Sequence, residues 1–224
     1  SYESIFQKNK IDRYEIVATS AFRDTSNSED ARRYIETAIN HPLRVISGLE
    51  EAQLIRFHPK SNTGKKKIFV DLGGGSTEFF LRDSKGIEIR SFQLGAVRNM
   101  LNKDKKAEWI RLEKWLETIK PRKKLIGIGG NIRSFLESQN KKELSAKELN
   151  KKMKEFSILS TQEKILKYQF SPDRADVIDH ALNIFNFISE HLMIETITST
   201  KWGISDSIGV KLFHEIYSNK INIS

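Results

Sequence analysis

The sequence predicts a layered α/β protein, because stretches typical of strands and of helices alternate along its 224 residues. Three features support this fold class. The N-terminal part reads as a strand-helix-strand unit, and the middle of the chain reads as three consecutive strands with short turns. Further on, a buried strand ends in glycines that lead into a helix.

The N-terminal unit is predicted from periodicity and capping. "YEIVATS" (14–20) is apolar and β-branched, and "LRVIS" (43–47) reads as a second strand. Between them, residues 26–40 open on serine and aspartate and carry apolar side chains at helical spacing. Residues 48–57 are expected to be helical, and the turn-rich segment 58–67 is a suitable place for a domain boundary.

The chain after residue 66 contains an antiparallel meander followed by helices and further strands. Its strands are expected at 67–73, 77–83 and 87–94, the first two joined by glycines. "SAKE" (145–148) and "STQE" (160–163) have the spacing of capping boxes. The remaining expected elements are helices at 107–119, 131–139, 171–192 and 204–217 and strands at 124–130 and 194–200.

Composition bounds the class of protein. The chain is 38% hydrophobic and 30% charged, and it has no run of about 20 apolar residues that could span a bilayer. It also lacks a signal-peptide pattern at its start, so no membrane partner and no export are expected. Cysteine is absent, which excludes disulfides and thiolate chemistry and fits a cytoplasmic location.

The net charge of +9 comes from lysine-rich runs. They lie at 64–67, 102–106, 120–124 and 141–154. A positive field favours polyanionic partners, either nucleic acid or a phosphate-rich molecule, although each run alone also fits a solvated surface. Nucleic acid is the weaker alternative, because neither zinc-finger spacing nor an aromatic RNA-binding signature is present.

The segment "VDLGGGSTEFF" (70–80) carries the main chemical signal. A glycine run between strands allows the backbone to approach a ligand, and successive N–H groups can bind phosphate oxygens. Asp71, at the end of a buried strand, is costly unless it binds a cation or accepts several hydrogen bonds. Glu78 follows on the return strand, and Mg²⁺ needs few protein ligands. The alternative is a glycine-rich hairpin with surface acids.

Several blocks together resemble the exopolyphosphatase/guanosine pentaphosphate phosphohydrolase (Ppx/GppA) family of the actin, Hsp70 and sugar-kinase superfamily. The resemblance spans most of the chain, and only the glycine block is distinctive by itself. The blocks are "ATSAFRD" (18–24), "VISGLEEAQL" (45–54), "VDLGGGSTEF" (70–79), "LGAVR" (94–98), "GIGGNIR" (127–133) and "RADVI" (174–178).

The resemblance implies a fold of two ribonuclease-H-like domains with a phosphate-binding cleft between them. Residues 1–57 would be the C-terminal part of the first domain, which is incomplete at its N-terminus. Residues 58–224 would be the second domain, with the last helix free to pack back on the first. The family's first phosphate loop precedes the region that matches "VATSA", so this chain does not contain it. Either the chain is a piece of a longer protein, or the natural protein lacks that hairpin.

The resemblance also assigns roles to individual residues. Glu51 matches the general base that deprotonates the attacking water. Adjacent helix residues point about 100° apart, so Glu50 and Glu51 cannot both face one cleft, and Glu50 is left to cap the helix. Asp71 and Glu78 match positions that bind Mg²⁺. The matching phosphate and substrate contacts are Arg23, Gly73, Gly74, Gly75, Ser76, Thr77, Gly129, Gly130 and Asn131, with Asn131 replacing the usual threonine.

The implied function is release of terminal phosphate from polyphosphate or guanosine pentaphosphate by metal-assisted attack of water. The alternative is a non-catalytic module that senses polyphosphate or an alarmone, and a superfamily kinase or ATPase ranks third. A homodimer is left open. The five histidines lack metal-ligand spacing and are expected to be structural or surface residues, and Trp109, Trp115 and Trp202 are expected to pack in cores.

Overall fold

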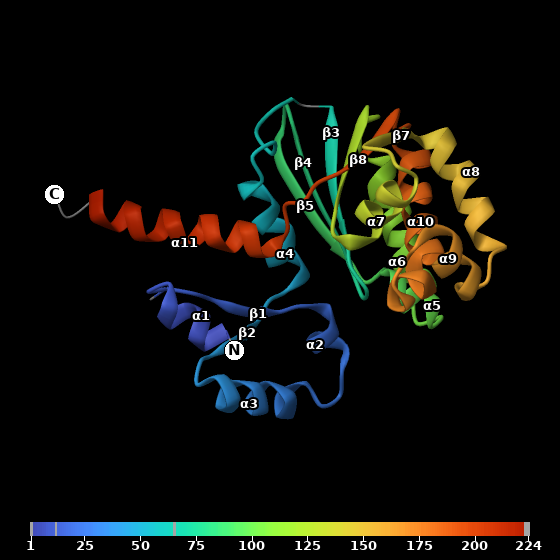
Figure 1. Cartoon of the computed structure of the whole chain (residues 1–224). Helices are drawn as coiled ribbons and strands as arrows, with labels where there is room; N and C mark the ends of the chain where they lie inside the picture. The colour runs from blue at the N-terminus through green and yellow to red at the C-terminus, as the bar shows by residue number, and fades with distance from the viewer. Residues whose placement is uncertain (1, 12, 65, 222–224) are drawn as a thin grey trace.

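A computed structural model describes residues 2–11, 13–64 and 66–221, and this part of the chain contains two sheets (Figure 1). The smaller sheet pairs two parallel strands, which two helices connect. A short helix, α1 (Tyr2–Lys8), precedes them. The elements of the unit are β1 (Ile16–Ala18), α2 (Ser20–Asp24), α3 (Ser28–Ile39) and β2 (Leu43–Val45).

The larger sheet has six strands in the order β5-β4-β3-β6-β8-β7. The predicted meander forms its first half, with β4 antiparallel to both β3 and β5. β6 and β8 continue the sheet parallel to β3, and β7 closes it antiparallel to β8. The strands are β3 (Lys67–Leu72), β4 (Thr77–Asp83), β5 (Gly86–Phe92), β6 (Lys124–Ile128), β7 (Glu143–Ser145) and β8 (Thr196–Ser199).

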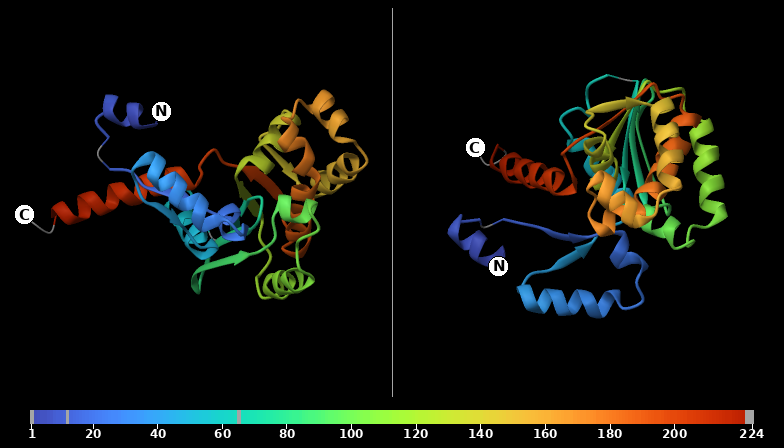
Figure 2. Two further views of the ribbon diagram at one scale, coloured as in Figure 1. Left: turned by 90° about the horizontal axis from the view of Figure 1, so that it is seen from below. Right: turned by 45° about the vertical axis from the view of Figure 1, so that its right-hand side comes forward.

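Helices cover both faces of the larger sheet (Figures 1 and 2). The side that carries the long helix α10 is covered by a group of helices between residues 96 and 191, whereas α4 and α11 lie on the opposite side, together with the smaller sheet. The helices are α4 (Gly48–Leu54), η1 (Ile55–Phe57), α5 (Ala96–Met100), α6 (Lys106–Glu117), α7 (Gly130–Ser138), α8 (Ala146–Ser157), α9 (Thr161–Tyr168), α10 (Pro172–His191) and α11 (Ile204–Ile221).

The alternation of side chains along β3 separates two cores. Ile68, Val70 and Leu72 are at most 1% exposed and point into the large core beneath α10. Phe69 points the other way, into a smaller cluster with Ile55 of η1. Both faces of β3 are therefore buried, which stabilises the sheet at the strand that leads into the glycines.

Most predicted elements are confirmed; many are shorter than predicted, whereas α11 extends past the predicted end at Tyr217 to Ile221. The expected strand 14–20 ends at Ala18, because Ser20 already begins α2. Both predicted capping boxes are present, and a third, Ser47 with Glu50, begins α4. α1, α2, α5 and β7 lacked a clear sequence signal, since each is at most seven residues long.

The last helix packs against α4 and η1 through Ile204, Ile208 and Leu212. The division of the chain at residue 57 stays a prediction. Within the described residues, no helix is both long enough and apolar enough to cross a bilayer.

His58 is a structural histidine at the junction between η1 and β3. Its ring is 4% exposed, contacts Phe69, and lies edge-on to Trp202. Nδ1 accepts the N–H of Lys60 at 3.0 Å, so Nε2 carries the proton and donates to Thr200 Oγ1 at 3.1 Å. Burial and the nearby lysine charges lower the pKa of His58 to about 4.

This pKa predicts a stability that falls in mild acid. Since the pKa of His58 is lower in the folded than in the unfolded state, its contribution is complete above about pH 6.5 and is lost as pH falls toward 4. We expect the difference in free energy of unfolding between the wild type and His58→Gln to shrink by about 1 to 3 kcal/mol as the pH falls from 7.5 to 4.5. Urea unfolding at several pH values measures this, and a pH-independent difference would contradict the assignment.

Candidate active site

The bend between β3 and β4 holds the triple glycine in a tight turn. The N–H of Gly73 donates to Ser76 O at 3.0 Å. Among the described residues, the N–H groups of Gly74, Gly75 and Ser76 have no hydrogen-bond acceptor. Three neighbouring free donors in a turn form a concave site for an anion, as the sequence predicts.

α4 brings Glu51 to this bend. The capping box fixes the start of the helix: Ser47 Oγ accepts from Glu50 N, and the Glu50 carboxylate accepts from Ser47 N at 2.8 Å. Glu50 also pairs with Arg44 on the surface. The side chain of Glu51, in contrast, is only 7% exposed. The two glutamates thus separate as helix geometry requires, one as a cap and one in the interior.

Arg23 orients Glu51. Its Nη1 lies 2.7 Å from Glu51 Oε1 and also donates to the carbonyl of Ile46, while Nη2 lies 3.4 Å from Ser76 Oγ. The arginine therefore connects α2, the start of α4 and the glycine bend. Three of the predicted site residues meet through this one guanidinium.

Asp71 and Glu78 complete an acidic group beside Glu51. They are directly opposite one another in the β3–β4 pair. Burial, and next the charge of Glu51, raise the pKa of Asp71 to about 7 and that of Glu78 to about 8. Burial also raises the pKa of Glu51, although Arg23 opposes the shift. Ser91 Oγ donates to Glu78 Oε1 at 2.9 Å.

Two glycines permit these close approaches. A Cβ on Gly48 would lie 2.8 Å from Ser91 Cβ and 3.0 Å from Glu78 Oε1, so α4 can pack on β4 and β5 only with glycine at that position. Gly129, at φ +92°, precedes α7, and a Cβ there would lie 3.3 Å from Asp71 Oδ1. The second glycine turn is thereby brought next to the acidic group.

Arg98 fastens the bend from α5, a role that sequence reasoning missed. Its Nε donates to Gly75 O at 2.8 Å, and its Nη2 pairs with Asp24 of α2. The backbone N–H of Arg98 donates to Gly74 O at 2.9 Å. Arg98 lies in the recognised block "LGAVR", but nothing in its spacing indicated a contact with residues 74–75.

Two predicted ligand contacts have other partners in the structure. We expected the Thr77 hydroxyl to donate to phosphate; it is fully buried and donates to Leu94 O at 2.6 Å. Asn131 was expected to offer its amide, but Nδ2 donates to Leu72 O at 2.9 Å and Oδ1 accepts from Arg174. Both side chains therefore brace the ends of β3 and β4. At Gly130 and Asn131 only the backbone N–H groups at the start of α7 remain for a ligand.

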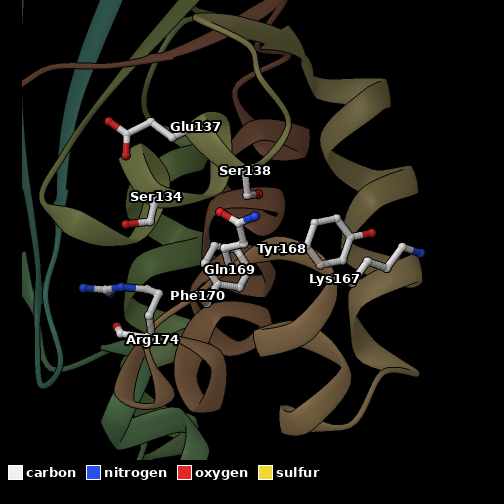
Figure 3. Close-up of a pocket in the computed structure, with 9 residues that line it drawn as sticks. Ser134, Glu137, Ser138, Lys167, Tyr168, Gln169, Phe170 and Arg174 are labelled. Atoms are coloured by element: carbon white, nitrogen blue, oxygen red, sulfur yellow. The ribbon is translucent and has the colours of Figure 1, made fainter.

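A cavity of about 440 Å³ lies beside this second glycine turn (Figure 3). Residues of α7, the end of α9 and the start of α10 line it. Figure 3 shows Ser134, Glu137 and Arg174 projecting to one side, away from Lys167. A Cβ on Gly130 would lie 2.7 Å from Arg174 Nη2, so this arginine links the cavity to the glycine turn. The sequence block "RADVI" contains Arg174, but its role was not predicted.

The donor set fits one divalent cation with few protein ligands. Mg²⁺ prefers carboxylate oxygens and keeps several waters. Asp71 and Glu78 supply two carboxylates whose pKa values are raised by burial and by the charge of Glu51. Within the described residues, no group of three acidic or histidine side chains forms a ready-made metal cage. The fit therefore rests on two carboxylates together with solvent and substrate oxygens.

Fold and site together define the class. A mixed α/β sheet carries, between β3 and β4, a glycine bend whose free N–H groups lie between two carboxylates, an arrangement suited to an anion and its cation. A family model, the Ppx/GppA phosphatase family, matches residues 1–215. The chain belongs to this family.

Solved structures agree on the fold. The chain is similar to the Ppx/GppA family member of Aquifex aeolicus, with 24% identity and a TM-score of 0.76, covering 96% of this chain and 78% of that one. It is similar to an exopolyphosphatase from Cytophaga hutchinsonii, with 20% identity and a TM-score of 0.80, covering 97% and 79%. The predicted family and fold class are confirmed.

Gly95 offers a test of the packing behind the bend. A Cβ there would lie 2.5 Å from the carbonyl carbon of Gly74, inside van der Waals contact with backbone that cannot rotate away. We expect Gly95→Ala to lower the free energy of unfolding by about 1 to 3 kcal/mol. The matched change Gly209→Ala, in the exposed part of α11 with nothing within 4 Å, should raise it by about 0.5 to 1 kcal/mol. Urea midpoints measure both, and equal effects would contradict the close approach.

Proposed function

We propose that the protein hydrolyses the terminal phosphate of a linear phosphate chain, either inorganic polyphosphate or the chain of guanosine pentaphosphate. In this reaction a water oxygen bonds to the terminal phosphorus, the bridging P–O bond breaks, and the products are orthophosphate and a chain shorter by one phosphate. The observation that supports it most directly is the convergence of Glu51, Arg23 and the glycine bend on one point. The names of the similar structures agree with this class of substrate.

Glu51 is proposed as the general base. Its carboxylate is buried beside the bend and has a raised pKa, which favours taking a proton from water. Arg23 fixes the carboxylate at Oε1, so the second oxygen is left to face a water. The proton lost by the attacking water is accepted there. A base held in one orientation lowers the entropic part of the barrier.

The bend is proposed as the phosphate site. The N–H groups of Gly74, Gly75 and Ser76 have no other acceptor in the described part of the chain and can donate to the oxygens of a terminal phosphate. Arg98 and Gly95 hold the bend from behind, so the donors are positioned before the substrate arrives. Preorganised donors act most strongly where charge develops during the reaction.

Asp71 and Glu78 are proposed as Mg²⁺ ligands. A bound Mg²⁺ would neutralise part of the charge on the phosphate chain during transfer. The same two carboxylates repel Glu51 and each other when no cation is present. The site is thus suited to a substrate that arrives with its metal.

The two glutamates of α4 provide the test of the base. Glu51→Gln should lower phosphate release from polyphosphate by about 10² to 10⁴, because a positioned proton acceptor is lost. Glu50→Gln keeps the capping box, because glutamine also accepts the Ser47 N–H, and loses only the surface ion pair with Arg44, so it should cost less than about 1 kcal/mol of stability while leaving turnover intact. Colorimetric phosphate assays on both purified variants measure the difference. Equal rates in wild type and Glu51→Gln would reject the assignment, and tight calorimetric binding without turnover in wild type would favour a sensor.

Replacing Asp71 tests the metal site, because the difference in melting temperature between the variant and the wild type should change sign when Mg²⁺ is added. Without Mg²⁺, Asp71→Asn should melt at a higher temperature than wild type, since a buried like-charge contact is gone. On addition of Mg²⁺ the wild type should gain stability and the variant should gain much less. Asp83→Asn, at the far end of β4, should keep the Mg²⁺ response. A thermal-shift titration measures all three, and an undiminished response in Asp71→Asn would contradict the proposal.

A further inference from the structure

Two of the lysine-rich runs meet at one end of the larger sheet. Lys67 and Lys124 begin the neighbouring parallel strands β3 and β6 and are register partners. Lys66 O accepts the N–H groups of Lys123 and Lys124 at 2.9 and 3.2 Å. Lys60 lies close enough to repel Lys67. We call these five residues the basic end: Lys60, Lys66, Lys67, Lys123 and Lys124. Lys65, in the same run, lies outside the described residues.

The positive charge at the basic end is only partly neutralised. Lys123 pairs with Glu195 at 3.4 Å, and Lys124 pairs with Glu143 at 3.2 Å. Among the described residues, no carboxylate forms an ion pair with Lys60, Lys66 or Lys67. Burial, and then the charges of Lys60 and Lys124, lower the pKa of Lys67. The amines crowd one another, and an incoming anion would relieve that repulsion.

We propose that the basic end binds the interior of an inorganic polyphosphate chain whose terminal phosphate occupies the glycine bend. This inference rests on the proposed function and adds a second contact for the same substrate. β3 connects the two places: it begins at Lys67 and ends one residue before Gly73. At about 3.3 Å per residue its six residues span about 20 Å, so only a long chain reaches both.

The chemistry of the basic end favours polyphosphate over nucleic acid. All five cations are lysines, which act as compact point charges. His58, which accepts the N–H of Lys60, and Phe69, which lies under the amine of Lys67, are 4% and 1% exposed, so neither ring can stack on a base. Lys67 and Asp71 lie on the same face of β3, at its two ends, with the buried ring of Phe69 between them.

The test compares two pairs of lysines that change the net charge equally. Lys60→Gln/Lys66→Gln removes exposed amines of the basic end that make no ion pair and lie outside the proposed active site. Lys147→Gln/Lys154→Gln removes two exposed amines of α8. Binding of fluorescently labelled long-chain polyphosphate is measured by anisotropy in EDTA at several salt concentrations. Phosphate release from tripolyphosphate with Mg²⁺ is measured in parallel.

We expect the pair at the basic end to weaken long-chain binding on the order of tenfold and to lower the slope of log K against log salt by about 1.5. The α8 pair should change binding less than twofold, and both pairs should release phosphate from tripolyphosphate at the wild-type rate. Equal weakening by the two pairs would overturn the proposal in favour of diffuse net charge. Absence of long-chain binding by wild type would also overturn it.

A further arm identifies the polymer and separates the two proposals. Single-stranded RNA with the same number of phosphates should compete weakly with polyphosphate. If RNA instead binds the wild type more tightly than polyphosphate, and Lys60→Gln/Lys66→Gln abolishes that binding, the partner is nucleic acid and the proposal is wrong. Long-chain binding that is lost only at the basic end supports the inference even if wild type releases no phosphate. If the wild type releases phosphate but does not bind the long chain, this inference is wrong while the proposed function still stands.

Discussion

The main physical constraint on this structure is the repulsion among three neighbouring buried carboxylates. Glu51, Asp71 and Glu78 come from α4, β3 and β4, and the charge of Glu51 raises the pKa of the other two. Such a group destabilises a fold unless surrounding packing holds it. Here β3 is buried on both faces, and Arg23 supplies a cation at Glu51. The repulsion between the carboxylates is therefore confined to the place where an anion and its metal are proposed to bind.

Much of the fold and part of the site could be predicted from the sequence, because those features are encoded locally. Strand alternation, the spacing of serine and glutamate in the capping boxes, and proline at the start of α10 each indicate an element without knowledge of its partners. The separation of Glu50 from Glu51 also followed from helix geometry alone. The glycine bend was recognisable because three consecutive glycines between two acids mark backbone that can approach a ligand closely.

Contacts between distant segments could not be predicted in the same way. Arg98 and Arg174 stand in ordinary helical contexts, and their roles arise only when α5 meets the bend and α10 meets α7. Thr77 and Asn131 show the converse. Their side chains looked like ligand donors, but folding places backbone carbonyls, Leu94 O and Leu72 O, within their reach. A buried donor takes the nearest good acceptor, since leaving either unpaired costs about 1 to 3 kcal/mol.

The lysine runs acquire a common location only through the topology of the larger sheet. Residues 64–67 and 120–124 each fit a solvated surface when considered alone. Parallel pairing of β3 with β6 joins them, because the strands that follow the two runs must begin at the same edge of the sheet. The opposite ends of the same strands carry Asp71 and the turn at Gly129, so the sheet is basic where its central strands begin and acidic where they end. In the proposed mode of binding, the first end attracts the polyanion and the second holds it together with a cation, and the length of β3 sets the distance between them.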